Sequence, residues 1–137
     1  MIDKEYGVER LVDFDKEEKR FVKKKKFFSL PVQIEELEEK VKKGEFEGTL
    51  YSHSDNPEPH DVYKLRLPNP DSNAGKSDGY RVYYMAVTQT RVVVFLVIHY
   101  KKEVPKLEDS YIKGLISGYF LGLQNESEGE EATGDLK

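Results

Sequence analysis

The sequence predicts an α+β fold in which an N-terminal strand and a helical hairpin pack on a small antiparallel sheet, followed by a C-terminal helix. Residues 62–67, 80–87 and 92–100 have the alternating or continuously apolar character of strands. Apolar residues at helical spacing precede them in residues 15–43 and follow them after residue 107. A run of helices followed by a run of strands is typical of the α+β class.

Composition limits the class of protein. A chain of 137 residues with 37% hydrophobic and 35% charged residues is long enough for one domain with its own core. It has no Cys, which excludes disulfides, a thiolate nucleophile and a cysteine zinc site. No signal-peptide pattern and no apolar run of membrane-spanning length is present, so we expect a cytoplasmic protein without a membrane partner.

Charge is distributed unevenly along the chain. The formal net charge is −4, and residues 125–137 alone carry five acidic residues and one Lys. Residues 1–124 therefore have 21 basic and 21 acidic residues and are neutral. We predict a single domain over residues 1–124 and an acidic, disordered tail over residues 125–137, because the tail has little apolar surface to bury.

The N-terminal part reads as a strand followed by two helices. Residues 7–14 are expected to form a short strand, and Asp15 is the expected N-cap of a helix over residues 15–28. Pro31 suits the first turn of a second helix, and Gly44 suits the position just past its end. The residues between this helix and the first predicted strand of the sheet are expected to be irregular.

Four consecutive lysines, at positions 23–26, lie near the end of the first predicted helix. Consecutive residues point around a helix and not to one side of it, so a solvated surface is one interpretation. A contribution to RNA or ribosome binding is the other.

The strand over residues 92–100 contains the run VVVFLVI and is the expected centre of the sheet, because a central strand hides both faces. The short connection at residues 88–91 predicts an antiparallel hairpin with the preceding strand. A final helix is expected to begin at Glu108 or Asp109.

Positive charge is concentrated in the predicted sheet. Residues 62–102 contain seven basic and two acidic residues, a net charge of +5 in a chain that is negative overall. The basic residues lie at the ends of neighbouring strands and in one loop. They are either separate solvated side chains or a surface that binds a polyanion.

Three segments carry a resemblance to a known family. They are Tyr63-Lys-Leu-Arg-Leu67, Gly75-Lys-Ser-Asp-Gly-Tyr-Arg81, and the strand from Val92 that ends in His99, Tyr100 and two lysines. In this order they resemble the RelE/ParE superfamily of toxins from type II toxin–antitoxin systems, and the RelE-like members most. The resemblance extends over roughly residues 8–123 and implies a strand, two helices and then an antiparallel sheet.

RelE-type toxins cleave mRNA on the ribosome by attack of a 2′-hydroxyl on the adjacent phosphate, without a metal or another cofactor. The reaction needs a base, an acid and cations that stabilise a dianionic phosphorane. The resemblance places Arg81 on the phosphate-binding arginine, while Lys102 stands where RelE has an arginine. The implied catalytic residues are Arg81, Lys64, Lys102 and His99, although His99 is equally consistent with a structural role. The expected RNA-binding residues are Arg66, Lys76, Lys101, Tyr100 and Tyr111, the two tyrosines being candidates for stacking on a base.

The resemblance leaves other functions open. A ParE-like protein would inhibit DNA gyrase by binding, and a homologue without activity would share the same fold. The implied partners are a cognate antitoxin and mRNA on the ribosome. The assembly is either a homodimer or a toxin–antitoxin hetero-oligomer.

Overall fold

The computed structural model describes residues 5–51 and 60–136, with side chains described as far as Gly122. The chain divides into two units, residues 1–106 and residues 107–137, which are described separately. The first unit contains the sheet and two helices, and the second is a helix. The elements, in chain order, are β1 (Gly7–Arg10), α1 (Val12–Lys23), α2 (Leu30–Lys42), β2 (Thr49–Leu50), β3 (His60–Leu67), η1 (Pro70–Ser72), β4 (Tyr80–Val87), β5 (Val92–Tyr100) and α3 (Asp109–Leu136).

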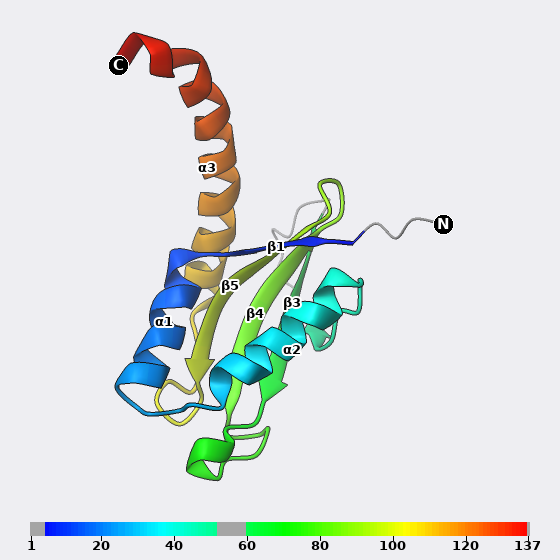
Figure 1. Cartoon of the computed structure of the whole chain (residues 1–137), viewed down its shortest axis with the longest axis vertical. Helices are drawn as coiled ribbons and strands as arrows, with labels where there is room; N and C mark the ends of the chain where they lie inside the picture. The colour runs from blue at the N-terminus through cyan, green and yellow to red at the C-terminus, as the bar shows by residue number, and fades with distance from the viewer. Residues whose placement is uncertain (1–4, 52–59, 137) are drawn as a thin grey trace. The chain divides into compact units, whose positions relative to one another are not determined.

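The described strands form one five-stranded sheet in the order β1-β5-β4-β3-β2 (Figure 1). The α+β class predicted from the sequence is confirmed. The expectation of an antiparallel sheet is wrong in one respect, because β1 joins the sheet and pairs parallel to β5. The chain can make this parallel pair because α1, α2, β3 and β4 lie between the two strands in sequence, which supplies the long connection that a parallel pair requires.

The β4–β5 hairpin has the bounds that the sequence predicts. Its antiparallel register runs from Tyr80 opposite Tyr100 to Val87 opposite Val92, with one irregularity between Tyr83 and Tyr84. Strand β5 lies between β1 and β4 and is therefore internal, but the middle of the sheet is β4, in which every residue is buried. Residues 92–100 were predicted to form the centre of the sheet, but the central strand is their neighbour β4.

Helix α1 begins earlier than the sequence suggests. Its N-cap is Leu11, whose N–H donates to the carbonyl of Phe95 at 2.9 Å, so Asp15 lies inside the helix and not at its cap. The early start places Phe14 against Phe95, with ring centroids 5.3 Å apart and nearly perpendicular. Burial of this aromatic pair outweighs the local capping preference of an aspartate. The helix ends at Lys23, before the predicted residue 28.

The region predicted to be irregular contains a short strand. β2 pairs antiparallel with β3 through Thr49 opposite Lys64 and Leu50 opposite Tyr63. Gly48 precedes it with φ of +106°, and a Cβ on this residue would lie 2.6 Å from the carbonyl oxygen of Lys64. A two-residue strand has no periodicity that sequence reading can recognise.

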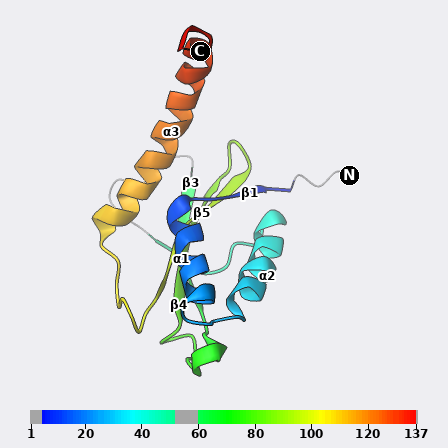
Figure 2. The same cartoon turned by 60° about the vertical axis from the view of Figure 1, so that its left-hand side comes forward.

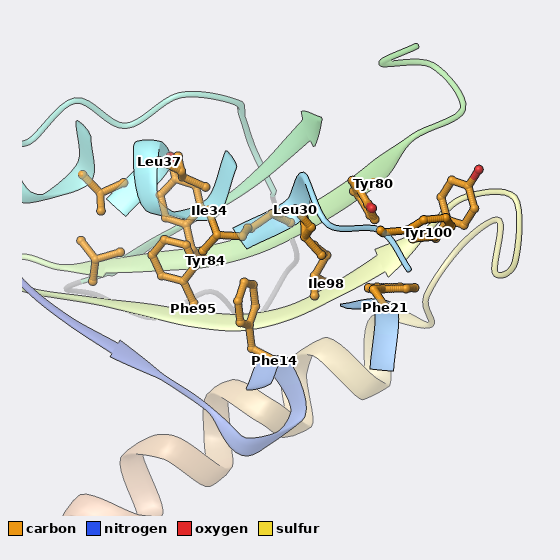
Figure 3. Packing of buried hydrophobic residues seen from close by; sticks show 14 of the residues in the cluster. Phe14, Phe21, Leu30, Ile34, Leu37, Tyr80, Tyr84, Phe95, Ile98 and Tyr100 are labelled. Carbon is orange, nitrogen blue, oxygen red and sulfur yellow. The ribbon is translucent and has the colours of Figure 1, made fainter. Parts of the chain in front are cut away.

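Helices α1 and α2 lie side by side on one face of the sheet (Figures 1 and 2). Their apolar stripes meet alternate residues of β4 and β5 to form the core shown in Figure 3, which includes Phe14, Phe21, Leu30, Ile34, Leu37, Tyr80, Tyr84, Phe95, Ile98 and Tyr100. The chain leaves α2 at Gly44, which has φ of +84° just past the helix end, as predicted.

The second unit is the helix α3, which begins at Asp109 as the sequence predicts. Its backbone continues through the segment predicted to be a disordered tail. That segment contains several Glu residues and an Ala, which favour a helix. None of the helices in the described residues combines the length and apolarity needed to span a bilayer.

Candidate functional site

A row of basic side chains crosses the face of the sheet that α1 and α2 do not cover. Tyr80 and Val82 of β4 belong to the core under the helices, so Arg81 between them points to the opposite face. Arg81 lies opposite Arg66 of β3 and opposite His99 of β5. Three neighbouring strands therefore place Arg66, Arg81 and His99 in one line, which we call the Arg66–His99 row. Lys64 lies two residues from Arg66 on the same face of β3.

Arg81 is almost fully buried, with 5% of its surface exposed. Its two terminal nitrogens donate to backbone carbonyls: Nη1 to Lys76 at 2.9 Å and to Tyr80 at 3.2 Å, and Nη2 to Ser77 at 2.8 Å. The guanidinium therefore holds the loop that precedes β4. Burial, followed by the like charge of Arg66, lowers the pKa of Arg81, but an arginine remains protonated at neutral pH.

His99 is equally buried and has one satisfied ring nitrogen. Nδ1 lies 2.8 Å from the carbonyl oxygen of Val104, and because a carbonyl can only accept, Nδ1 carries the proton. Nε2 is then a lone-pair acceptor, and it is shielded from solvent and has no hydrogen-bond partner among the residues that the structure describes. The ring stacks on Tyr83 at a centroid distance of 6.0 Å and an interplanar angle of 22°.

The electrostatics of the row keep His99 neutral. Burial is the largest cause of a lowered His99 pKa, the hydrogen bond to Val104 opposes it, and the positive charges of Arg81 and Lys64 lower the pKa further. His99 therefore presents a neutral imidazole among cations at pH 7. Such a group accepts a proton, while the cations attract an anion such as a phosphate.

Lys101 and Lys102 lie in the turn directly after β5. The N–H of Lys101 donates to Gly79 at 2.9 Å, which ties this turn to the loop before β4. Lys102 is exposed, and the turn continues to Val104, the partner of His99. Lys102 therefore follows His99 closely in sequence. The turn that carries it is positioned by the hydrogen bonds of Lys101 with Gly79 and of His99 with Val104.

Lys76 and Arg66 line a second feature, a groove of about 320 Å³ between α2 and the end of β3. Both side chains are exposed at the rim of the sheet, and the backbone oxygen of Lys76 is the acceptor for Arg81. The structure therefore brings together two of the predicted RNA-binding residues, Arg66 and Lys76, and connects both to Arg81.

Tyr100, one of the two tyrosines predicted to stack on a base, does not join the row. Tyr100 points to the helix-covered face, where its ring packs against Phe27 and Tyr80 at centroid distances of 5.5 and 5.6 Å. Its hydroxyl lies 2.6 Å from Ser72 Oγ. Tyr111 belongs to α3, in the second unit of the chain, and is 38% exposed.

Tyr83 is a residue of the site that sequence reading did not identify. It follows Arg81 by two positions on β4, so strand alternation alone places both on one face. Its stacking on His99 depends on the β4–β5 register, which a sequence does not reveal to single-residue accuracy. The hydrogen bond between His99 and the carbonyl of Val104 could not be predicted from the sequence either, because Val104 belongs to an irregular turn.

The described residues contain no group of three or more His, Cys, Asp or Glu side chains arranged to hold a metal. Searches with the chain found no matching family model, no matching curated protein and no matching solved structure.

Proposed function

We propose that this chain is a RelE-like toxin that cleaves mRNA on the ribosome without a metal. The observation that carries the proposal is the geometry around His99. Its Nε2 has no hydrogen-bond partner in the described part of the chain, and the residue lies in line with Arg66 and Arg81 on the sheet face that also carries Lys64. The order of elements in the first unit, a strand, two helices and then strands, agrees with what the resemblance to this family implies.

In the proposed reaction His99 Nε2 accepts the proton of an RNA 2′-hydroxyl. The oxygen then attacks the adjacent phosphorus, and the bond to the 5′-oxygen of the next nucleotide breaks. The products are a 2′,3′-cyclic phosphate and a 5′-hydroxyl, with Lys64 and Lys102 as the candidate acids for the leaving oxygen. Arg66 contributes a guanidinium with five N–H donors, which suits the oxygens of the phosphorane.

Arg81 is assigned a positioning role in this proposal. Both of its terminal nitrogens donate to carbonyls of its own strand and the preceding loop, so they are not directed at a substrate. Its positive charge lowers the His99 pKa, and its hydrogen bonds fix the loop that carries Lys76. Because Nε2 is shielded, substrate binding must displace the side chains that cover it.

The same arrangement of Arg81 favours a second candidate, a ParE-like protein that inhibits DNA gyrase by binding. A protein that does not cleave needs no arginine aimed at phosphorus, and a buried Arg81 that supports a loop is then sufficient. In either case we expect a cognate antitoxin to bind the chain. An extended or helical segment that lies over a sheet is a common mode of such recognition.

The test is incubation of the purified protein with ribosomes programmed with a defined mRNA, with the same mRNA alone, and with gyrase and relaxed plasmid. Cleavage that requires the ribosome supports the proposal. Gyrase inhibition with intact mRNA would establish the second candidate. His99→Gln should slow cleavage by about 10²–10⁴-fold, while Arg91→Gln, which changes an arginine at the far end of the hairpin, should not.

A further inference from the structure

The acidic side chains and the lysines of helix α1 differ in whether they form ion pairs. Three of its four acidic residues pair with arginines: Glu18 Oε1 with Arg10, Asp15 Oδ1 with Arg10 at 3.4 Å, and Glu17 Oε1 with Arg20 at 2.9 Å. Both arginines are less than half exposed. The negative charge of this helix is therefore largely neutralised next to the body of the protein.

The lysines of the same helix have no acidic partner among the described residues. Lys16, Lys19 and Lys23 are exposed, and their spacing of three and four residues places them on one side of α1. Lys24 and Lys26, in the turn that follows, are exposed and also lack an acidic partner there. We call these five side chains the lysine stripe.

An ion-pair cluster holds the turn after β5 beside the end of α1. Glu103 Oε1 accepts from Arg20 Nη2 at 2.6 Å, and Glu103 Oε2 lies 3.1 Å from Lys25 Nζ. The turn that carries Lys102 is thereby held against the C-terminal end of α1. Phe28, which follows the stripe, is 62% exposed although its neighbour Phe27 is buried.

We propose that the lysine stripe binds the phosphate backbone of folded RNA without reading its sequence. Successive lysines of the stripe on α1 are separated by about 4.5–6 Å along the helix axis, from a rise of 1.5 Å per residue. Several unpaired cations in a line match the regular negative charge of a nucleic-acid strand. The inference goes beyond the proposed cleavage and does not depend on it, since the stripe lies on the helical layer and the Arg66–His99 row on the opposite face of the sheet.

An anionic membrane is a poorer match to the stripe. A helix that lies in a membrane interface needs a broad exposed apolar face beside its lysines. The apolar face of α1 is occupied, because Phe14 and Phe21 are fully buried in the core. Val12 and Phe28, the exposed apolar residues at either end of this segment, supply only small and separate apolar areas.

The experiment measures binding of the full chain to an RNA hairpin of mixed sequence by fluorescence anisotropy, over a series of salt concentrations. The variant Lys16→Gln/Lys19→Gln/Lys23→Gln is compared with Lys40→Gln/Lys42→Gln/Lys43→Gln, which removes the same charge from the last turn and C-cap of α2. Each lost phosphate contact reduces the slope of log K against log salt by about 0.7–0.9, so the α1 variant should reduce it by roughly 2 to 3. The α2 variant should leave the slope within about one unit of wild type.

Equal losses in the two triple variants would overturn the proposal, because net charge alone would then explain binding. So would undetectable binding of wild type at low salt, or binding to vesicles of anionic lipid that depends on the stripe while RNA binding does not. The hairpin assay contains no ribosome. Stripe-dependent binding without any mRNA cleavage would therefore refute the proposed function alone, and cleavage with stripe-independent binding would refute this inference alone.

Discussion

Replacement of Arg81 tests whether this arginine supports the loop before β4. Arg81→Met keeps an unbranched apolar stem of similar reach and removes the donors. The lost interactions are hydrogen bonds of 2.8, 2.9 and 3.2 Å from a buried cation to three carbonyls. Hydrogen bonds from charged groups contribute about 1.5–3 kcal/mol each, and they are not additive.

Part of this stabilisation is offset because burial of the arginine is itself costly, as its lowered pKa indicates. We therefore expect Arg81→Met to lower the free energy of unfolding by about 2–3 kcal/mol, well below the simple sum of the three bonds. At about 4 °C per kcal/mol for a chain of this size, Tm should fall by roughly 8–12 °C. Arg81→Lys should fall between wild type and Arg81→Met, because one ammonium cannot satisfy the carbonyls of both Lys76 and Ser77.

The assay is urea unfolding followed by circular dichroism, with hydrogen exchange at the Asp78 amide as a local measure. The Asp78 N–H donates to Gly75 within the loop at 3.2 Å and should exchange faster in the variant. Arg66→Met is the control, because Arg66 lies opposite Arg81, is exposed, and has a side chain with no hydrogen bond or ion pair among the described residues. It should change stability by less than about 0.5 kcal/mol. Equal stability of the two variants would refute the structural role of Arg81.

Three further predictions concern Gly79, His99 and Glu103. Gly79→Ala should destabilise the protein by more than about 2 kcal/mol, because its Cβ would lie 2.1 Å from the carbonyl oxygen of Leu67, whereas Gly75→Ala has open space and should be nearly neutral in thermal unfolding. Because the pKa of His99 is lowered in the folded protein, the unfolded chain binds a proton at His99 more readily than the folded chain does. The free energy of unfolding should therefore decrease as pH falls below about 6.5, and His99→Gln should make this decrease smaller. The pKa of Glu103 is lowered, chiefly by its hydrogen bond from Arg20, so its contribution to the free energy of unfolding is present above about pH 4.5 and is lost as pH falls further. Glu103→Gln should remove this loss of stability in acid. An unchanged dependence of stability on acidic pH in the variant would contradict the ion pair.

Local patterns were sufficient for much of the fold. The β4 and β5 bounds follow from continuous apolar runs with a short turn between them, and Gly44 marks the end of α2 because only a residue that tolerates positive φ fits there. The start of α1 did not follow from local preference. The contact between Phe14 and Phe95, more than eighty residues apart, decides it.

Long-range pairing also explains what could not be predicted about the site. Alternation places Lys64, Arg66 and Arg81 on strands, but only the register shows that Arg66, Arg81 and His99 share one line. The same alternation assigns Tyr100 to the core, since it follows His99 directly. The use of Arg81 as a loop support depends on the path of the loop, for which residues 68–79 carry no periodic signal.

The most direct test of the proposed function is analysis of the RNA ends produced from programmed ribosomes under single-turnover conditions, for wild type and His99→Gln. The proposed mechanism predicts an upstream fragment that ends in a 2′,3′-cyclic phosphate and a downstream fragment with a 5′-hydroxyl. It also predicts a rate reduced by about 10²–10⁴-fold when the general base is removed. Intact mRNA with wild type, a 5′-phosphate on the downstream fragment, or an unchanged rate for a folded His99→Gln protein would contradict it.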